Sequence, residues 1–130
     1  MPTAPPLHPS PIYPGHPDYD ALLAWPFPTT PFYAAQVLNV LRNDIPQRML
    51  FETCIVWLYR DGGGNAVGFG TLAVTQEYPQ FTNGLRHVYI PVLGVHPDFG
   101  GKGYGESIVN HLFSEAVLFY RDPSLFRNPS

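Results

Sequence analysis

The distribution of proline is the feature that most constrains how this chain folds. Ten of its 16 prolines lie within the first 31 residues. Because proline has no N–H group and a fixed φ, such a density excludes helix interiors and favours extended, polyproline-like chain. We therefore expect residues 1–20 to form an arm outside the folded unit, with apolar side chains available for docking on a neighbouring surface: Ile12, Tyr13 and Tyr19.

Composition narrows the class of protein. Charged residues make up 13% of the 130 residues and the formal net charge is −3, which argues against a protein that coats nucleic acid or an anionic membrane. No leader pattern and no long apolar stretch is present, so we expect a cytoplasmic chain without a membrane span. The single cysteine, Cys54, excludes an intramolecular disulfide and is expected to be buried. The histidines are too scattered to predict a metal site: His8, His16, His96 and His111.

Regular hydrophobic patterns begin after the proline-rich segment. Thr30 is typical of a helix cap and Pro31 of a first helical residue. The spacing then places three apolar residues on one helical face: Val37, Leu38 and Leu41. Pro46 indicates the end of this helix.

A hairpin, a third strand and a second helix are expected next. Residues 54–59 and 66–77 are predicted strands joined by a glycine-rich turn, and a third strand covers residues 87–95. That strand should be irregular near Pro91, which cannot donate to a ladder. Residues 103–120 carry apolar side chains at helical spacing. The order of helix, three antiparallel strands and helix predicts an α/β or α+β domain.

Residues 93–106 form the most informative junction, because a strand leads through several glycines into a helix. Unpaired amides and the helix dipole make such a junction suitable for phosphate or pyrophosphate, and Lys102 adds a positive charge at its rim. The alternative is a tight turn whose glycines only satisfy backbone geometry. Glycine content alone does not separate the two.

Two other phosphate-binding motifs are excluded by spacing. A Walker loop has glycine where this chain has His96, and serine or threonine where it has Gly103. The dinucleotide fingerprint ends in glycine or alanine, where residues 101–106 have Glu106. Residues 68–73 do fit the relaxed fingerprint, but they lie within a predicted hairpin strand, so we interpret them as a chance match.

The stretch from Val95 to Gly105, with the apolar-striped helix after it, resembles motif A of the GNAT family of N-acetyltransferases. That motif is written Gln/Arg-x-x-Gly-x-Gly/Ala, and its three defined places hold Gly100, Gly103 and Gly105. Gly100 departs from the family, which prefers glutamine or arginine there.

The resemblance covers about residues 50–120. It implies a GNAT-like fold, a mixed and mainly antiparallel sheet flanked by helices. The acetyltransferase-like domain would span residues 21–130, with motif A and its helix at 93–120.

The resemblance also implies acetyl-coenzyme A as cosubstrate. Backbone groups of Leu93, Gly94 and Val95 would pair with the pantetheine arm like an added strand. The amide near Leu93 would stabilise the oxyanion during direct transfer to an amine. The loop and the first helical turn would hold the pyrophosphate through backbone amides: Gly100, Gly101, Lys102, Gly103, Tyr104, Gly105 and Glu106.

Acetyl transfer to an amine requires the neutral amine, and a lysine-like amine has a pKa of about 10.4. Family members often carry a carboxylate early in the third strand, where this chain has Tyr89. Strand alternation would place Tyr89 on one face with His87, Pro91 and Leu93. The candidate catalytic residues are therefore Tyr89, His87 and Glu77.

Family domains continue beyond this helix with further strands and a helix, whereas only residues 121–130 follow here. The resemblance thus implies a C-terminally short domain whose open sheet edge favours a homodimer or a partner chain. The implied function is acetyl transfer from acetyl-coenzyme A to a primary amine of unknown identity. The alternative is a non-catalytic acyl-coenzyme A-binding or assembly module of the same fold.

Overall fold

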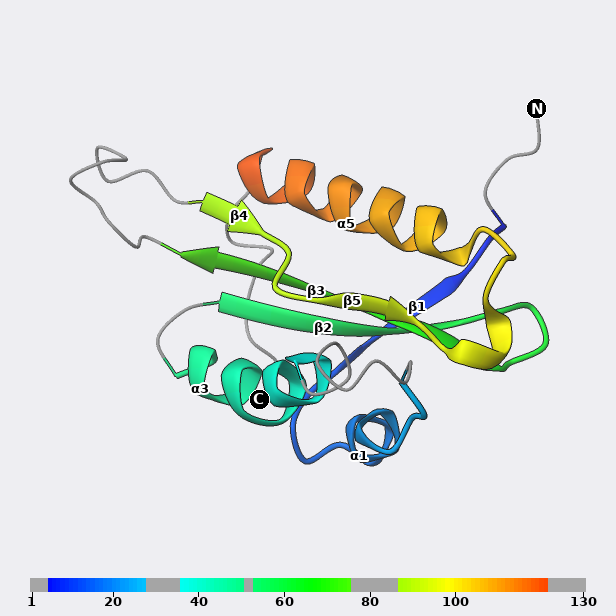
Figure 1. The fold of residues 1–130 in the computed structure, drawn as a ribbon. Coiled ribbons are helices and arrows are strands. Elements are labelled where there is room, and N and C mark those ends of the chain that lie inside the picture. Colours follow the sequence, from blue (N-terminus) through cyan, green and yellow to red (C-terminus); the bar gives the residue numbers. More distant parts are fainter. Residues whose placement is uncertain (1–4, 28–35, 51–52, 76–86, 122–130) are drawn as a thin grey trace.

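A computed structural model describes residues 5–27, 36–50, 53–75 and 87–121 of the chain. A single sheet separates helix α5 on one face from α1, η1 and α3 on the other (Figure 1). This arrangement confirms the predicted α+β class. The elements are, in chain order, β1 (His8–Ile12), α1 (Pro17–Leu23), the π-helical turn η1 (Val40–Asp44), α3 (Ile45–Arg48), β2 (Thr53–Arg60), β3 (Ala66–Thr75), β4 (His87–Tyr89), β5 (Leu93–Val95), the 3₁₀ turn η2 (Pro97–Phe99) and α5 (Tyr104–Arg121).

The sheet is antiparallel throughout. Its strands follow the order β1-β2-β3-β4, and β5 also pairs with β3. Strand alternation divides the core into two layers. The layer on the α1 and α3 side includes Tyr19, Leu41, Ile45, Cys54, Val56 and Phe69. The layer beneath α5 includes Trp57, Tyr59, Leu72, Ile108, Leu112 and Phe119.

The N-terminal segment differs from the arm expected for residues 1–20. Residues 8–12 form β1, paired with β2 from His8 opposite Arg60 to Ile12 opposite Val56. Helix α1 follows within the same segment, and the Tyr19 hydroxyl donates a hydrogen bond to the carbonyl of Leu41 at 2.5 Å. Ile12 and Tyr19 are almost wholly buried. The segment is therefore part of the packed core where the structure describes it.

The physical reason is that an edge strand is itself extended chain. Pro9 and Pro11 occupy alternate positions of β1, so both missing N–H groups fall on the same side of the strand. With that side turned to the open edge, β1 still pairs with β2 through its other residues. The proline density thus favoured the right backbone conformation but did not reveal the partner strand.

The first core helix also differs from its prediction. Thr30 and Pro31 lie outside the described residues, and the helix does not end at Pro46, which lies in the first turn of α3. In the π-turn before it, the Ile45 amide donates to the carbonyl of Val40, five residues back. This wider turn lets the helix resume with proline where no N–H is needed.

The predicted irregularity near Pro91 is confirmed, because β4 and β5 are two short strands separated by residues 90–92. Thr71 of β3 bridges the break. Its hydroxyl accepts from the Val92 amide at 2.9 Å and donates to the Val92 carbonyl at 2.5 Å. The buried Thr71 side chain is thereby satisfied, and the break is held at a fixed place against β3.

The glycines of residues 68–73 serve close packing of helix on sheet. A Cβ at Gly68 would lie 2.6 Å from Ile108 Cδ1, and a Cβ at Gly70 would lie 3.1 Å from Leu112 Cδ1. These residues belong to β3 and do not open a helix, which explains the dinucleotide-like spacing without a ligand.

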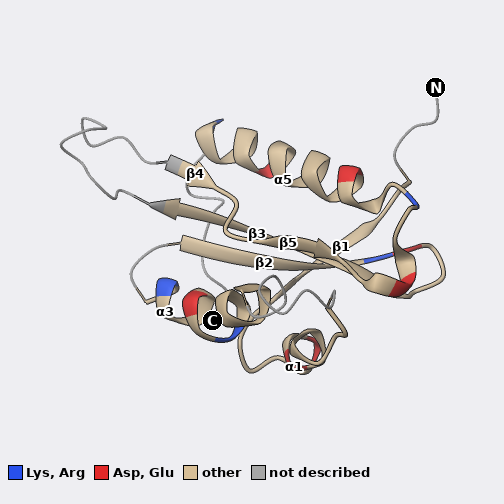
Figure 2. Ribbon diagram, in the orientation of Figure 1, with Lys and Arg blue, Asp and Glu red and all other residues tan. Residues whose placement is uncertain are grey.

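Charged residues are scattered over the described elements and do not gather into one basic or acidic face (Figure 2). Among the described helices, none combines the length and the apolar character needed to cross a bilayer.

Candidate functional site

The loop between β5 and α5 is built on two glycines in left-handed conformation. After the 3₁₀ turn η2, Gly101 has φ of 78° and Gly103 has φ of 80°. L-residues with a side chain rarely adopt this region. The loop that contains them leads from β5 into α5 (Figure 1).

The start of α5 presents unpaired backbone donors. The first amide hydrogen bond of this helix runs from Ser107 to the carbonyl of Gly103 at 3.3 Å. Among the described residues, no acceptor faces the amides of residues 104–106. Cβ atoms at Gly100 and Gly101 would meet little or nothing within 4 Å, and Lys102 is exposed beside them. Together with the helix dipole, these donors form a patch suited to an anion.

Strand β5 lies next to this patch and has a free edge. It pairs with β3 through Gly68 opposite Val95 and Gly70 opposite Leu93. No other described strand pairs with it, so its outer edge offers backbone donors and acceptors to an extended ligand. Gly94 is required here because a Cβ would lie 2.7 Å from Phe69 Cε1. The structure thus brings together all the residues predicted for cofactor binding, from Leu93 to Glu106.

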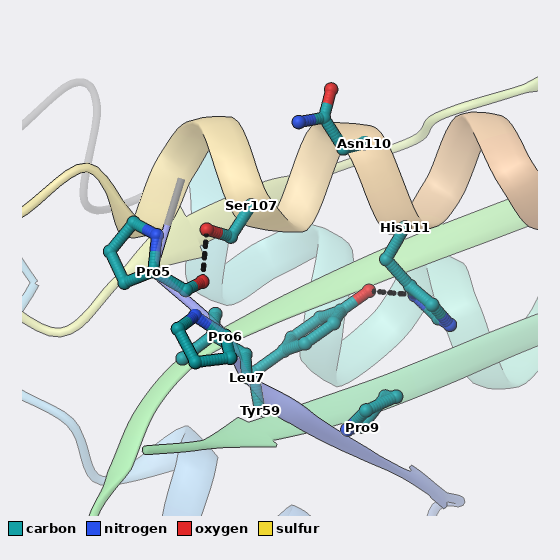
Figure 3. Close-up of a pocket in the computed structure, with 8 residues that line it drawn as sticks. All are labelled: Pro5, Pro6, Leu7, Pro9, Tyr59, Ser107, Asn110 and His111. Atoms are coloured by element: carbon teal, nitrogen blue, oxygen red, sulfur yellow. Dashed lines mark hydrogen bonds between the residues drawn. The ribbon is translucent and has the colours of Figure 1, made fainter. Parts of the chain in front are cut away.

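The N-terminal segment covers one side of the helix start, a feature that sequence reasoning missed. The Ser107 hydroxyl donates to the carbonyl of Pro5 at 2.6 Å, and Pro5 Cδ lies 3.3 Å from where a Cβ of Gly103 would be. A cavity of about 240 Å³ lies beneath this contact, between the segment and α5 (Figure 3). Its lining residues are Pro5, Pro6, Leu7, Pro9, Tyr59, Ser107, Asn110 and His111.

A chain of three polar groups lies beside this cavity. The Tyr59 hydroxyl is 2.6 Å from Nδ1 of His111 (Figure 3). Nε2 of His111 is 3.3 Å from Oε1 of Glu115. Burial raises the pKa of Tyr59 and lowers the pKa of His111. The tyrosine therefore stays protonated and donates to the neutral imidazole, whose Nε2–H faces the carboxylate. These three groups link β2 to α5. The helical spacing of His111 and Glu115 was visible in the sequence, but the contact of His111 with Tyr59 was not.

Two of the three candidate catalytic residues lie in the described part of the chain, both in β4. Tyr89 ends β4 opposite Ala73, and its hydroxyl accepts a hydrogen bond from Nη1 of Arg48. His87 is the first residue of β4, and Glu77 lies outside the described residues. No sequence signal pointed to Arg48, which is 41 residues away along the chain.

The expectation that Tyr89 and Leu93 share a strand face is wrong. Tyr89 packs with the core layer on the α1 and α3 side, whereas Leu93 packs beneath α5. The reason lies in the register: Tyr89 is opposite Ala73 and Leu93 is opposite Gly70, so four steps along this chain match three along β3. The extra residue at the break near Pro91 inverts the alternation.

Comparison with known proteins agrees with this geometry. The sequence model of the acetyltransferase (GNAT) family matches residues 16–119. Searches of curated proteins and of solved structures found no significant match. The family match covers well over half of the chain. It includes strands β2 to β5, the helical elements on both faces of the sheet, the glycine loop and nearly all of α5. The chain therefore belongs to the GNAT family of acetyltransferases.

Proposed function

We propose that this chain transfers the acetyl group of acetyl-coenzyme A to a primary amine. The observation that carries the proposal is the row of amides at residues 104–106, which meets no acceptor among the described residues and lies beside the free edge of β5. A pyrophosphate is the kind of anion that such a helix start binds. Membership of the family supports acetyl transfer as the reaction class.

In this proposal the chain binds its cosubstrate mainly through backbone groups. Residues 93–95 pair with the amide-bearing pantetheine arm along the open edge of β5. The amides from Gly101 to Glu106 hold the pyrophosphate, and Lys102 adds a positive charge at the rim. The amide near Leu93 stabilises the negative charge that develops on the thioester oxygen as the amine attacks. No covalent intermediate on the protein is needed.

The attacking amine must first lose a proton. Three residues are proposed as candidate bases, Tyr89, His87 and Glu77. Tyr89 has the strongest support, because its hydroxyl is held in place by a hydrogen bond from Arg48.

Calorimetric titration with acetyl-coenzyme A and coenzyme A tests the binding part. The structure offers a matched pair of variants, since Gly101 and Gly64 both have positive φ and a Cβ at either would meet nothing within 4 Å. We expect saturable binding by the wild type and by Gly64→Ala, and binding at least about tenfold weaker by Gly101→Ala, a cost of about 1.4 kcal/mol. Absence of binding by the wild type would contradict the proposal.

A thiol-release assay with a panel of primary amines tests the transfer part. Release of coenzyme A that depends on the amine, with the acetylated amine identified by mass spectrometry, is the expected result. Binding of the cosubstrate without release on any amine would instead indicate the alternative function, a non-catalytic acyl-coenzyme A-binding module.

A further inference from the structure

Helix α5 carries a stripe of exposed apolar side chains, formed by Phe113, Val117 and Tyr120 and called here the α5 stripe. Phe113 and Tyr120 are each 64% exposed, and Val117 is 48% exposed. Their spacing of four and three residues places them on one face of the helix. The helix uses a different face against the sheet, where Ile108 and Leu112 are buried next to β3. The α5 stripe is therefore apolar surface that the core does not use.

The polar groups along the middle of α5 are satisfied within the chain. Between its first and last turns the helix has a single carboxylate, Glu115, whose Oε1 lies 3.3 Å from Nε2 of His111. The Ser114 hydroxyl donates to the carbonyl of Asn110 at 3.0 Å. A contiguous exposed apolar surface is typical of an interaction site. This one can be covered without leaving a charge or a hydroxyl group unpaired.

The two ends of the α5 stripe carry opposite charges. Glu106 lies in the first turn of α5 and Arg121 in the last, both are exposed, and about 22 Å of helix separates them. Phe113 lies midway between them. When two copies of α5 pack antiparallel, each Glu106 lies beside Arg121 of the other copy and the apolar side chains meet between them. A parallel pair would bring like charges together. The charge pattern therefore fits a second, antiparallel copy of the same helix.

We propose that two copies of this chain form a two-fold symmetric dimer through antiparallel packing of their α5 stripes, with Glu106 of each copy paired to Arg121 of the other. The inference goes beyond the proposed function and does not depend on it. The contact uses the helix and not the sheet edge that the sequence had suggested, so it makes no use of the outer edge of β5. A lipid surface fits less well, because helices that lie on membranes are rich in lysine and arginine and α5 has Arg121 alone.

The size of the α5 stripe sets the expected strength of the dimer. Phe113 and Tyr120 together expose on the order of 250 Å² in each copy. A pair of helices of this length gives an interface below about 1,200 Å², the lower end for specific complexes. We therefore expect a reversible dimer with a Kd of about 10–100 µM. Its population should depend on protein concentration and not on coenzyme A.

Analytical ultracentrifugation over a concentration series tests the surface. The wild type should pass from monomer to dimer, and both Phe113→Asp and Val117→Asp should weaken the dimer by at least about tenfold. Leu50→Asp is the matched control, since Leu50 is 75% exposed, follows α3 on the other face of the sheet and undergoes the same change in charge. It should dimerise like the wild type. Thermal unfolding of each variant separates a folding defect from a loss of contact.

Charge reversal tests the antiparallel orientation. Glu106→Arg and Arg121→Glu should each weaken the dimer, because each brings like charges together, and the double reversal Glu106→Arg/Arg121→Glu should restore it. In a parallel pair the double reversal would leave like charges opposed, so absence of rescue would overturn the arrangement. A wild type that stays monomeric up to about 1 mM, well above the expected Kd, would overturn the dimer and leave the α5 stripe to another protein. A dimer that persists in both aspartate variants would overturn this surface.

Discussion

Two glycine-rich turns lie near each other at one end of the sheet, the β2–β3 turn at residues 61–65 and the loop at residues 100–103 (Figure 1). The β2–β3 turn is closed by hydrogen bonds between its own residues. Oδ1 of Asp61 accepts from the amides of Gly63 and Asn65 at 3.0 and 2.9 Å, and the Gly64 amide donates to the Asp61 carbonyl at 3.1 Å. In the second, Gly101 and Gly103 adopt the same positive φ, but the amides that follow at 104–106 have no acceptor among the described residues.

The difference teaches that glycine content is not the signal for a binding loop. Asp61 supplies the hydrogen-bond acceptor that its turn needs, so that turn has little left to offer a ligand. The loop before α5 ends in a helix, whose first amides cannot be paired within the helix. The two turns therefore differ in whether backbone N–H groups are left without an acceptor, and substitutions in each turn test this difference.

The largest effect is expected for valine at the left-handed glycines. Gly103→Val should abolish detectable coenzyme A binding, a loss of more than about 100-fold, because a branched side chain forces the loop out of its conformation and onto Pro5. Gly64→Val should keep wild-type affinity. Calorimetry measures both, and equal loss in the two variants would show that the turns do not differ in function.

Stability should respond equally at the two turns. Gly101 and Gly64 have φ of 78° and 83°, and a Cβ at either would meet open space. Each change to alanine should therefore lower the free energy of unfolding by about 1 kcal/mol, from backbone strain alone. Denaturant titration without ligand gives the values. A much larger loss in Gly101→Ala would mean that its effect on binding reflects unfolding.

A smaller effect is expected at Lys102, which is exposed at the rim of the loop. Lys102→Ala should weaken coenzyme A binding by about twofold to fivefold at low salt, because an exposed charge contributes little and is screened. The loss should shrink as salt is added. A loss that persists at high salt would indicate a direct, water-excluded contact.

The smallest effect is expected for the pKa of Asp61 in the β2–β3 turn. Hydrogen bonds from Asn65 hold the pKa of Asp61 below its ordinary value of 3.8, and the charge of Lys102 contributes weakly in the same direction. Since the pKa is lowered in the folded state, the stabilisation from this group is present above the unfolded pKa and is lost as pH falls through the folded value. NMR titration of the Asp61 carboxyl should show the lowered pKa, with a slight rise in Lys102→Ala. An ordinary pKa would indicate that the turn is not closed in solution.

Local patterns were enough to predict the hairpin, the break near Pro91 and the residues that form the loop before α5. Each depends on neighbours in sequence: the alternation of a strand, the missing N–H of a proline and the positive φ of a glycine. The proline-rich start was harder, because extended chain and edge strand have the same local conformation and only the pairing with β2 distinguishes them.

The sequence by itself determined the helix start with its unpaired amides, since the donors belong to the backbone and the glycines that expose them are local. Only the tertiary structure decided that Tyr89 and Leu93 face opposite layers and that Arg48 meets Tyr89. The opposite facing of Tyr89 and Leu93 depends on one extra residue between β4 and β5 relative to β3. The contact between Arg48 and Tyr89 depends on the packing of α3 near the end of β4. Both are relations between segments distant in sequence, which are set when the core is packed and leave no periodic pattern in either segment.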